Sequence, residues 1–545
     1  MRFWRVAPFV LCVALYWPVL GQHLLSDDMS VAYALHQWTT QGEMWTKLLA
    51  KFASGLDSPS FYYRPLTFLS FGLNYASVGV VPLTWHLVNL IGHLLAGAAV
   101  FRIVVLLQAL RGIGTRDSIA GPVAATSLFL LWGTNAEAVA WVSGRYDVFA
   151  TMLVLWACAH YLQSASAFNG RSVVALACGA LALCSKESAA VVPGLIGCLA
   201  WIRYGSKPFG DRWRAIIVDM LPWLALIAAY FTLRHAIFGN AFQVYPQAKP
   251  LERISGGEWL TTLDAARPWL ESALPSPIGL KATSALLVLT LLACLVWALR
   301  ERAAARAFVG IAGTVVVTLA LLLPHLSGLS PNGEGGRLFY TTGAMTAILL
   351  ALPLTGREHN GRHIRPTRLL YLAMMMLIGV QAFLLSCALR DWRRAGSQMT
   401  QLVHALPALA ERLGSGRYAL LFAPDAIGAA PFIRNANGGM VLPPVQRQPL
   451  LNRILIFRPS DAGENPPLIN KRLIPVLKSY SLENSAAQLR EADPSEDPLT
   501  LWPTDLLCWD TEKAELKTVT LAEGWMDAAR WVPALHEGLR RAGCR

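Results

Sequence analysis

Long apolar runs, each ending near a cluster of charged residues, recur over the first 390 residues of the chain. Most run for about 15 to 22 residues, and a helix needs about 20 apolar residues to cross a hydrocarbon core about 30 Å thick. The pattern therefore predicts a polytopic α-helical membrane protein with about eleven transmembrane helices. The predicted spans are 3–20, 86–108, 119–133, 147–163, 172–185, 188–202, 215–234, 282–299, 307–325, 338–354 and 369–389.

The composition agrees with a membrane protein and disfavours an ordinary soluble enzyme. Hydrophobic residues make up 54% of the 545 residues and charged residues only 15%, against about a quarter charged in soluble domains. The formal net charge is +13, which can indicate nucleic-acid binding. Here the basic residues lie between apolar runs, so we interpret them as topology signals and expect no nucleic-acid partner.

Every second connection carries the Lys and Arg residues, which places the N-terminus in the cytoplasm by the positive-inside rule. An odd number of spans then puts the polar segments 22–83, 236–281, 326–337 and 391–545 on the outer face. The first span also resembles a cleavable signal peptide. Retention is favoured, because its loss would leave an even number of helices and move the polar C-terminal part into the cytoplasm.

Two domains are predicted: a transmembrane catalytic domain over 1–390 and an outer-face C-terminal domain over 391–545. The second has short runs typical of strands at 418–422, 453–457 and 516–521, so we expect a small α/β domain. Seven of the nine cysteines lie in apolar spans. The other two, Cys508 and Cys544, could form a disulfide in an oxidising compartment.

Two spans, 119–133 and 172–185, are only about 22 Å long, so their outer ends should stop below the membrane surface. Polar residues follow each of them: Asn135, Glu137, Arg145 and Asp147 after the first, Lys186 and Glu187 after the second. A helix running straight through Lys186 and Glu187 would cost roughly 5 to 7 kcal/mol. We expect a helix break there and a recessed polar cavity; the alternative is a purely structural ion pair.

Asp27 and Asp28 are the first carboxylates after the first span. Ser26 or Asp27 could simply cap a helix that continues through Tyr33. A carboxylate at this position could instead act as a general base toward a hydroxyl or, at Asp28, hold a divalent metal ion such as Mg²⁺ or Mn²⁺.

Arg337 follows a glycine-rich loop and precedes an apolar run. A cation at a helix N-terminus opposes the helix dipole, which favours a role in binding an anionic phosphate. The alternative is snorkelling of the side chain to the membrane surface.

An ordered set of short motifs resembles the C-type (GT-C fold) superfamily of polytopic membrane glycosyltransferases, above all the transmembrane-and-tetratricopeptide O-mannosyltransferases and their bacterial relatives. The resemblance covers roughly residues 20 to 345. Besides the acidic pair, its residues are Tyr63-Arg64-Pro65, Asn74, His86, Asn89, His93, Glu137-Ala138-Val139, Gly144-Arg145-Tyr146-Asp147, Ser185-Lys186-Glu187, Arg337 and Tyr340.

The resemblance implies inverting transfer of a sugar from a polyprenyl-phosphate carrier to a glycan, lipid or protein acceptor on the outer face of the membrane. Asp27 or Asp28 would be the base or metal-holding acid, and Arg337 and Lys186 would bind the donor phosphate. Arg64, Asn74, His86, Asn89 and His93 match motif positions without an assigned task. The chain's resemblance to bacterial relatives of this family implies a cytoplasmic (inner) membrane with a periplasmic C-terminal domain.

The chain also departs from the O-mannosyltransferase pattern. Trp132-Gly133 and Asn135 stand where that family has histidines, Glu334 lies three residues before Arg337, and no tetratricopeptide repeat follows residue 390. A different acceptor is therefore expected. A transporter or lipid-linked sugar flippase remains the main alternative, because broken helices with charges are expected there too. A scaffold or sensor is disfavoured by the number of spans.

Overall fold

A computed structural model of the chain describes residues 2–55, 61–114, 119–164, 169–242, 277–299, 301–322, 329, 333–359, 362–364, 368–413, 418–434, 437–450, 453–457, 503–520 and 528–544. The chain divides into two compact units. The first comprises Met1–Leu20, Trp45–Phe71 and His86–Leu389, and the second comprises Gly21–Met44, Gly72–Trp85 and Arg390–Arg545.

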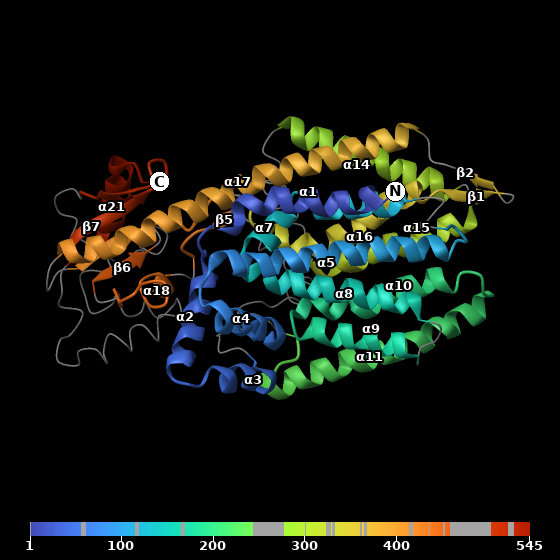
Figure 1. Ribbon diagram of the computed structural model, residues 1–545, viewed down its shortest axis with the longest axis horizontal. Helices are drawn as coiled ribbons and strands as arrows, with labels where there is room; N and C mark the ends of the chain where they lie inside the picture. The colour runs from blue at the N-terminus through green and yellow to red at the C-terminus, as the bar shows by residue number, and fades with distance from the viewer. Residues whose placement is uncertain are drawn as a thin grey trace. The chain divides into compact units, whose positions relative to one another are not determined.

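The first unit is a helical bundle (Figure 1). Its helices are α1 (Arg2–Leu20), α3 (Met44–Ser54), α5 (Pro82–Ala109), α6 (Ala120–Leu130), α7 (Asn135–Ala140), α8 (Arg145–Gln163), α9 (Gly170–Leu183), α10 (Val192–Arg203), α11 (Phe209–Phe238), α14 (Pro277–Ala298), α15 (Arg302–Leu322) and α16 (Tyr340–Ala351). Short 3₁₀ turns lie between them: η1 (Val142–Gly144), η2 (Glu187–Val191), η4 (Gly336–Phe339) and η5 (Leu352–Thr355). A small hairpin of β1 (Arg357–His359) and β2 (Arg362–Ile364) precedes the long helix α17 (Arg368–Leu413).

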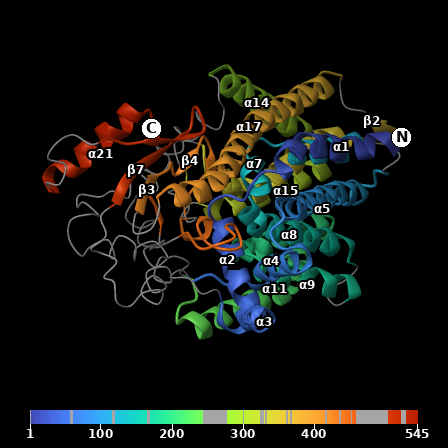
Figure 2. The same ribbon diagram turned by 60° about the vertical axis from the view of Figure 1, so that its left-hand side comes forward.

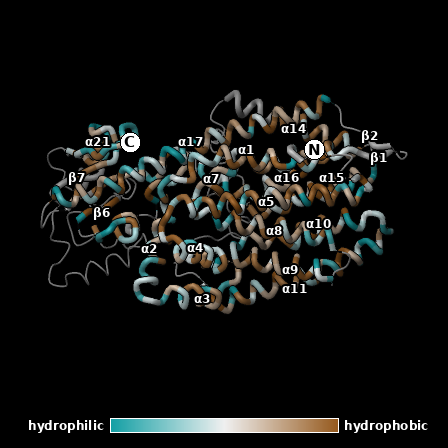
Figure 3. Tube along the Cα trace, in the orientation of Figure 1, coloured by the Kyte–Doolittle hydropathy of each residue, from teal (hydrophilic) through white to brown (hydrophobic). Residues whose placement is uncertain are grey.

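Each of the eleven apolar runs coincides with a helix, and most of these helices are apolar along their length (Figure 3). Among the described residues, five segments are long and apolar enough to cross a membrane: Pro82–Ala109, Phe209–Phe238, Arg302–Leu322, Gly336–Thr355 and Arg368–Leu413. Shorter apolar helices occupy Trp4–Leu20, Ala120–Leu130, Gly170–Leu183 and Ala285–Ala298. The described residues therefore have the helices of a multi-pass membrane protein, and the total of eleven spans stays a prediction.

The two short spans are short in the structure as well. Helix α6 has 11 residues and α9 has 14, or about 17 and 21 Å at 1.5 Å per residue. Helix α9 starts at an Asn169 cap, whose side chain accepts the Ser172 N–H at 2.9 Å. It ends before Lys186, and α10 begins only after the turn η2. The predicted break at Lys186-Glu187 is therefore confirmed.

Small residues let the helices of this unit approach closely. On α15, a Cβ at Gly310 would overlap the side chain of Ile202 on α10, and one at Gly313 would lie 2.9 Å from Cys198 Sγ. Such small-residue contacts replace the hydrophobic driving force that is missing between helices in lipid.

The second unit combines helices with a small sheet. It contains α2 (Asp27–Thr40), the end of α4 (Pro65–Val78) and the second half of α17. Its four-stranded sheet has the order β6-β3-β7-β8, with β3 (Tyr418–Phe422) parallel to β6 (Ile454–Phe457) and β7 (Pro503–Asp510), and β8 (Glu515–Thr518) antiparallel to β7. The predicted strands 418–422 and 453–457 are thus confirmed, to within one residue, as β3 and β6. The predicted strand 516–521 is confirmed in part, because β8 covers its first half.

Helices and a hairpin complete this unit. Figure 2 shows α21 (Ala528–Ala542) beside β7, and α17 packs on the same strand, since Trp509 Nε1 donates to Gln398 Oε1 at 3.0 Å. A hairpin of β4 (Ala426–Ile427) and β5 (Ala430–Pro431) leads to the short helix α18 (Asn437–Met440). Much of the predicted outer loop 236–281 and residues 458–502 lie outside the described residues.

Candidate functional site

The helix is interrupted between α9 and α10, and this interruption places two opposite charges inside the first unit. Each charge pairs with a different segment. Lys186 Nζ lies 2.5 Å from Asp147 Oδ1 at the start of α8. Glu187 pairs with Arg64, whose Nε donates to Glu187 Oε2 at 2.9 Å and whose second nitrogen contacts Oε1. The two-point geometry is typical of an arginine–carboxylate fork. Lys186 and Glu187 thus belong to two different ion pairs, an arrangement that the sequence did not predict.

Burial and charge oppose each other at Glu187. Burial alone would raise the pKa of its carboxyl, but the Arg64 guanidinium outweighs burial and lowers the pKa to about 2. Arg64 also lies over the rings of Tyr62 and Tyr146, 4.1 and 5.0 Å from their centroids. The pair is therefore charged at neutral pH, and its cation lies against two aromatic rings.

Arg337 and Glu137 form a third ion pair between motif residues of the first unit. Arg337 Nη1 lies 2.5 Å from Glu137 Oε1, and the Gly335 N–H donates to Glu137 Oε2 at 2.8 Å. The guanidinium also lies 4.6 Å from the centroid of the Trp141 ring. Arg337 sits in the turn η4 just before α16, as predicted, and Glu137 balances the unfavourable dipole there.

These three pairs differ in how far their cations reach the surface. The side chain of Arg337 is 27% exposed, whereas those of Lys186 and Arg64 are 12% and 11% exposed. The Glu137 carboxylate behind Arg337 is only 5% exposed. Of the cations in these three pairs, Arg337 is therefore the most open to an incoming anion.

Several motif residues have core positions in the first unit. Arg145 is fully buried; its Nε donates to Asn89 Oδ1 at 2.9 Å, and its guanidinium lies 4.3 Å from the Phe71 centroid. Asn89 Nδ2 in turn donates to the Trp141 carbonyl at 2.7 Å. This network ties α5 and the start of α8 to the turn that carries Trp141.

The two motif histidines are buried too. His93 Nδ1 lies 2.6 Å from the Tyr340 hydroxyl, and its Nε2 lies 3.1 Å from the Leu130 carbonyl, so both ring nitrogens have partners within the bundle. His86 is buried on α5. In the second unit, Asn74 is buried on α4.

The acidic pair opens α2 in the second unit. Asp28 is buried and Asp27 is half-buried, so Asp27 is the more accessible carboxylate. Asp28 Oδ2 accepts the Leu25 N–H at 3.2 Å. Its carboxylate therefore helps to fix the turn.

Ser26 does not cap α2 as the sequence suggested. It occupies the cap position but has φ 51° and ψ −128°, and its side chain makes no capping hydrogen bond. The backbone conformation explains this, because it turns Ser26 away from the extended geometry that a capping serine adopts. Its hydroxyl has no hydrogen-bond partner within the described part of the chain. Positive φ at a buried non-glycine residue marks stored strain, which concentrates at functional sites.

A metal site is not evident in the described parts of the chain. Among those residues, no three His, Cys, Asp or Glu side chains gather in a group that could hold a metal ion. The acidic turn offers two adjacent carboxylates, and one oxygen of Asp28 already accepts a backbone N–H. This donor set alone does not make a complete coordination cage.

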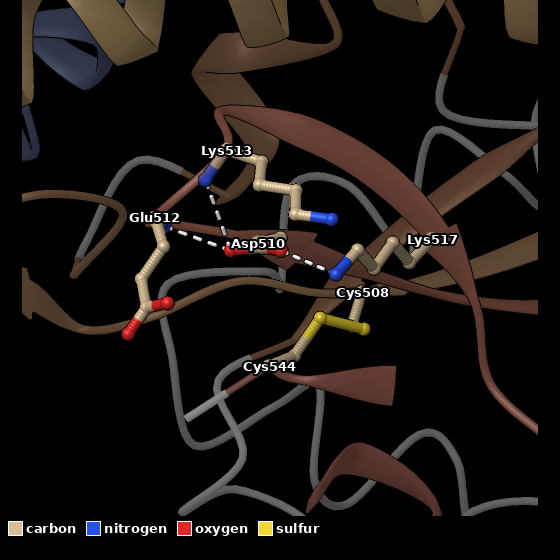
Figure 4. The surroundings of a disulfide bond; sticks show 6 residues. All are labelled: Cys508, Asp510, Glu512, Lys513, Lys517 and Cys544. Carbon is tan, nitrogen blue, oxygen red and sulfur yellow. Dashed lines mark hydrogen bonds and ion pairs between the residues drawn. A yellow bond between two sulfur atoms is a disulfide. The ribbon is translucent and has the colours of Figure 1, made fainter. Parts of the chain in front are cut away.

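The C-terminal cysteines are bonded. Cys508 on β7 and Cys544 after α21 form a disulfide with a Cα–Cα distance of 6.1 Å (Figure 4). Two residues further along β7, Asp510 pairs with Lys517 of β8, and its Oδ1 accepts the Glu512 N–H at 2.8 Å. The Lys517 hydrogen bond lowers the pKa of the Asp510 carboxyl to about 2.

Sequence comparison gives partial matches to one group of enzymes. The chain is 37% identical over 99 residues to "Protein O-mannosyl-transferase Tmtc1" of Drosophila melanogaster, 34% over 158 residues to Tmtc2 of the same species, and 30% over 159 residues to TMTC3 of Homo sapiens. The matches cover 18%, 28% and 28% of this chain and 11%, 16% and 16% of those proteins. No family model matches the chain, and no solved structure matches it significantly. Over less than a third of its length, the chain is thus similar to proteins named as O-mannosyl-transferases.

Proposed function

We propose that the chain is a membrane glycosyltransferase that moves a sugar from a polyprenyl-phosphate carrier to an acceptor on the outer face, with inversion at the anomeric carbon. The observation that carries the proposal is the similarity to protein O-mannosyl-transferases. The names of these relatives favour a protein hydroxyl as the acceptor, while a glycan or lipid hydroxyl has the same chemistry. Lys and Arg residues lie in every second connection between the apolar runs, which supports an acceptor site on the outer face. The Cys508–Cys544 disulfide supports an oxidising compartment such as the periplasm.

In this proposal Arg337 binds the donor phosphate. Departure of polyprenyl phosphate leaves negative charge on the phosphate oxygens, and a guanidinium fork suits those oxygens. Arg337 combines the greatest exposure of the three pairs with a fixed position on the Trp141 ring. Lys186 is the second phosphate ligand; because Asp147 holds it at 2.5 Å, it supplies a positioned charge.

Asp27 acts as the general base. The acceptor hydroxyl oxygen attacks the anomeric carbon, its proton passes to the Asp27 carboxylate, and the bond between that carbon and the phosphate oxygen breaks with its electron pair on the phosphate. Asp27 is favoured over Asp28 because it is half-buried, whereas Asp28 is buried and accepts a backbone N–H. The alternative role for Asp28 is to hold a divalent ion together with the donor phosphate.

The test uses the purified full chain in nanodiscs with a panel of polyprenyl-phosphate sugars and hydroxyl acceptors, in which mass spectrometry follows release of polyprenyl phosphate. Asp27→Asn should abolish release, whereas Asp211→Asn, at an exposed carboxylate on α11, should not. Chelation by EDTA separates the two roles of the acidic pair, since only the metal role predicts loss of turnover.

A transporter or flippase is the second candidate, favoured by the charged break between α9 and α10. Carrier movement across liposomes without any covalent product would support transport and overturn the transferase. Full activity of Asp27→Asn would overturn the assignment of the base.

A further inference from the structure

The strained turn that carries the acidic pair is held from outside by distant parts of the same unit. The Ser26 N–H donates to the Phe432 carbonyl at 3.0 Å, and Ser26 itself is fully buried. Phe432 is fixed in turn, because its N–H donates to the Asp425 carbonyl at 2.7 Å and its side chain is fully buried. The residue that stores the strain is thus tied to the hairpin β4–β5 of the C-terminal part.

Two glycines lie close to residues on either side of this turn, Gly439 to the Met29 backbone and Gly396 to the Gln22 side chain. A Cβ at Gly439 would lie 2.7 Å from both the carbonyl carbon and oxygen of Met29, in the first turn of α2. A Cβ at Gly396 on α17 would lie 2.5 Å from Gln22 Cβ, just before the turn. Real Cβ atoms do not approach so closely, so the absence of side chains at both sites allows residues 22–29 to pack as they do.

The hairpin is itself anchored to α17. Gly428 in its turn has φ 58°, and the Ala429 N–H donates to Asp391 Oδ2 at 3.4 Å. A side chain at Gly428 would overlap Asp391. A continuous path of contacts therefore runs from α17 through the hairpin and the Phe432 carbonyl to Ser26, the residue before Asp27.

We propose that residues 425–434 and 437–440, together with Gly396, are a positioning element that fixes the orientation of the Asp27 carboxylate. This inference rests on the proposed function, in which Asp27 is the base. The C-terminal part then contributes to the rate of sugar transfer itself, since a catalytic group displaced by about 1 Å can lose roughly 100-fold in rate. Gly439 and Asp391 act through the turn and do not touch substrate.

The decisive variant is Gly439→Ala, which adds one methyl group against the Met29 backbone. We expect kcat to fall about 100-fold and KM for the donor to stay unchanged, because the donor phosphate is bound elsewhere in the chain. Hydrogen exchange of residues 22–32 should become faster in the same variant. The matched control is Gly379→Ala on α17, where nothing lies within 4 Å of the added Cβ; its kinetics and exchange should match the natural chain.

Asp391→Ala serves as the second variant should Gly439→Ala fail to fold. We expect a fall in kcat of about tenfold and rescue by Asp391→Asn, which keeps an oxygen that can accept the Ala429 N–H. Natural kcat and natural exchange in a folded Gly439→Ala or Asp391→Ala would overturn the inference. If the natural chain shows no turnover with any donor, the proposed function fails, but the exchange of residues 22–32 still tests the positioning contacts.

Discussion

Arg337 and Glu137 stand 200 residues apart in the chain, yet Arg337 Nη1 lies 2.5 Å from Glu137 Oε1. The pair joins the turn before α16 to the short helix α7. Glu137 also accepts the Gly335 N–H, so one buried carboxylate fixes both the backbone and the side chain of the turn. This dual role makes Glu137 a structural support of the proposed phosphate ligand.

Replacing Glu137 should therefore destabilise the first unit. Removing one partner of a buried ion pair costs about 3–5 kcal/mol, and we expect the lower end for Glu137→Ala because Arg337 is partly exposed. Glu537→Ala is the contrast, because Glu537 pairs with Arg540 and Arg541 on the exposed side of α21, where ion pairs contribute about 0–1 kcal/mol. Unfolding in detergent, followed by circular dichroism, measures both. Equal losses in the two variants would contradict the buried support.

Substitution of Arg337 should separate charge from geometry. Arg337→Gln removes the cation and should lower kcat/KM at least about 100-fold, the usual effect of losing one donor to developing negative charge. Arg337→Lys keeps the charge but loses the fork and the contact with Trp141, so we expect only partial recovery. Turnover of polyprenyl-phosphate sugar is the measurement. Arg214→Gln, at an exposed cation on α11, should behave as the natural chain does, and a Gln variant at 337 with normal turnover would remove Arg337 from the site.

The helices could be predicted from the sequence, because an apolar run flanked by charges is a local signal. The break at Lys186 was predictable for the same reason, since two adjacent charges are costly in a continuous membrane helix. Which distant residues form ion pairs with these charges was not predictable. Arg64 meets Glu187 across 123 residues, and neither periodicity nor composition encodes which distant segments meet.

The acidic turn shows a second limit. Its carboxylates were visible in the sequence, but Ser26 looked like a helix cap, and nothing local indicates that a serine adopts φ 51°. The contacts that hold this conformation come from Phe432 and Gly439, far along the chain. Long-range packing decided the geometry against the local preference.

Variants at Ser26 should reveal the strain directly. A non-glycine residue in this backbone region costs about 1–3 kcal/mol, so Ser26→Gly should stabilise the second unit by about 1 kcal/mol, net of the extra freedom of glycine when unfolded. Ser26→Val should destabilise it, because a β-branched residue tolerates positive φ poorly. Ser26→Ala isolates the effect of the buried hydroxyl. Denaturant unfolding of the three variants gives the comparison; a valine variant as stable as the glycine variant would show that the turn is unstrained.

The Asp510–Lys517 pair predicts an acid limit for the C-terminal sheet. Lys517 lowers the pKa of Asp510 to about 2, whereas an unfolded aspartate titrates near 3.9. Because the folded-state pKa is the lower one, the pair stabilises the fold fully above about pH 4, and this contribution is lost as the pH falls from about 4 through about 2. Asp510→Asn should weaken the protection of residues 503–520 against hydrogen exchange at pH 7 and should remove the part of the acid dependence that lies between pH 4 and 2. Glu411→Gln, at an exposed carboxylate on α17, should leave both unchanged. Identical acid profiles of Asp510→Asn and the natural chain would show that this carboxylate does not link the sheet to pH.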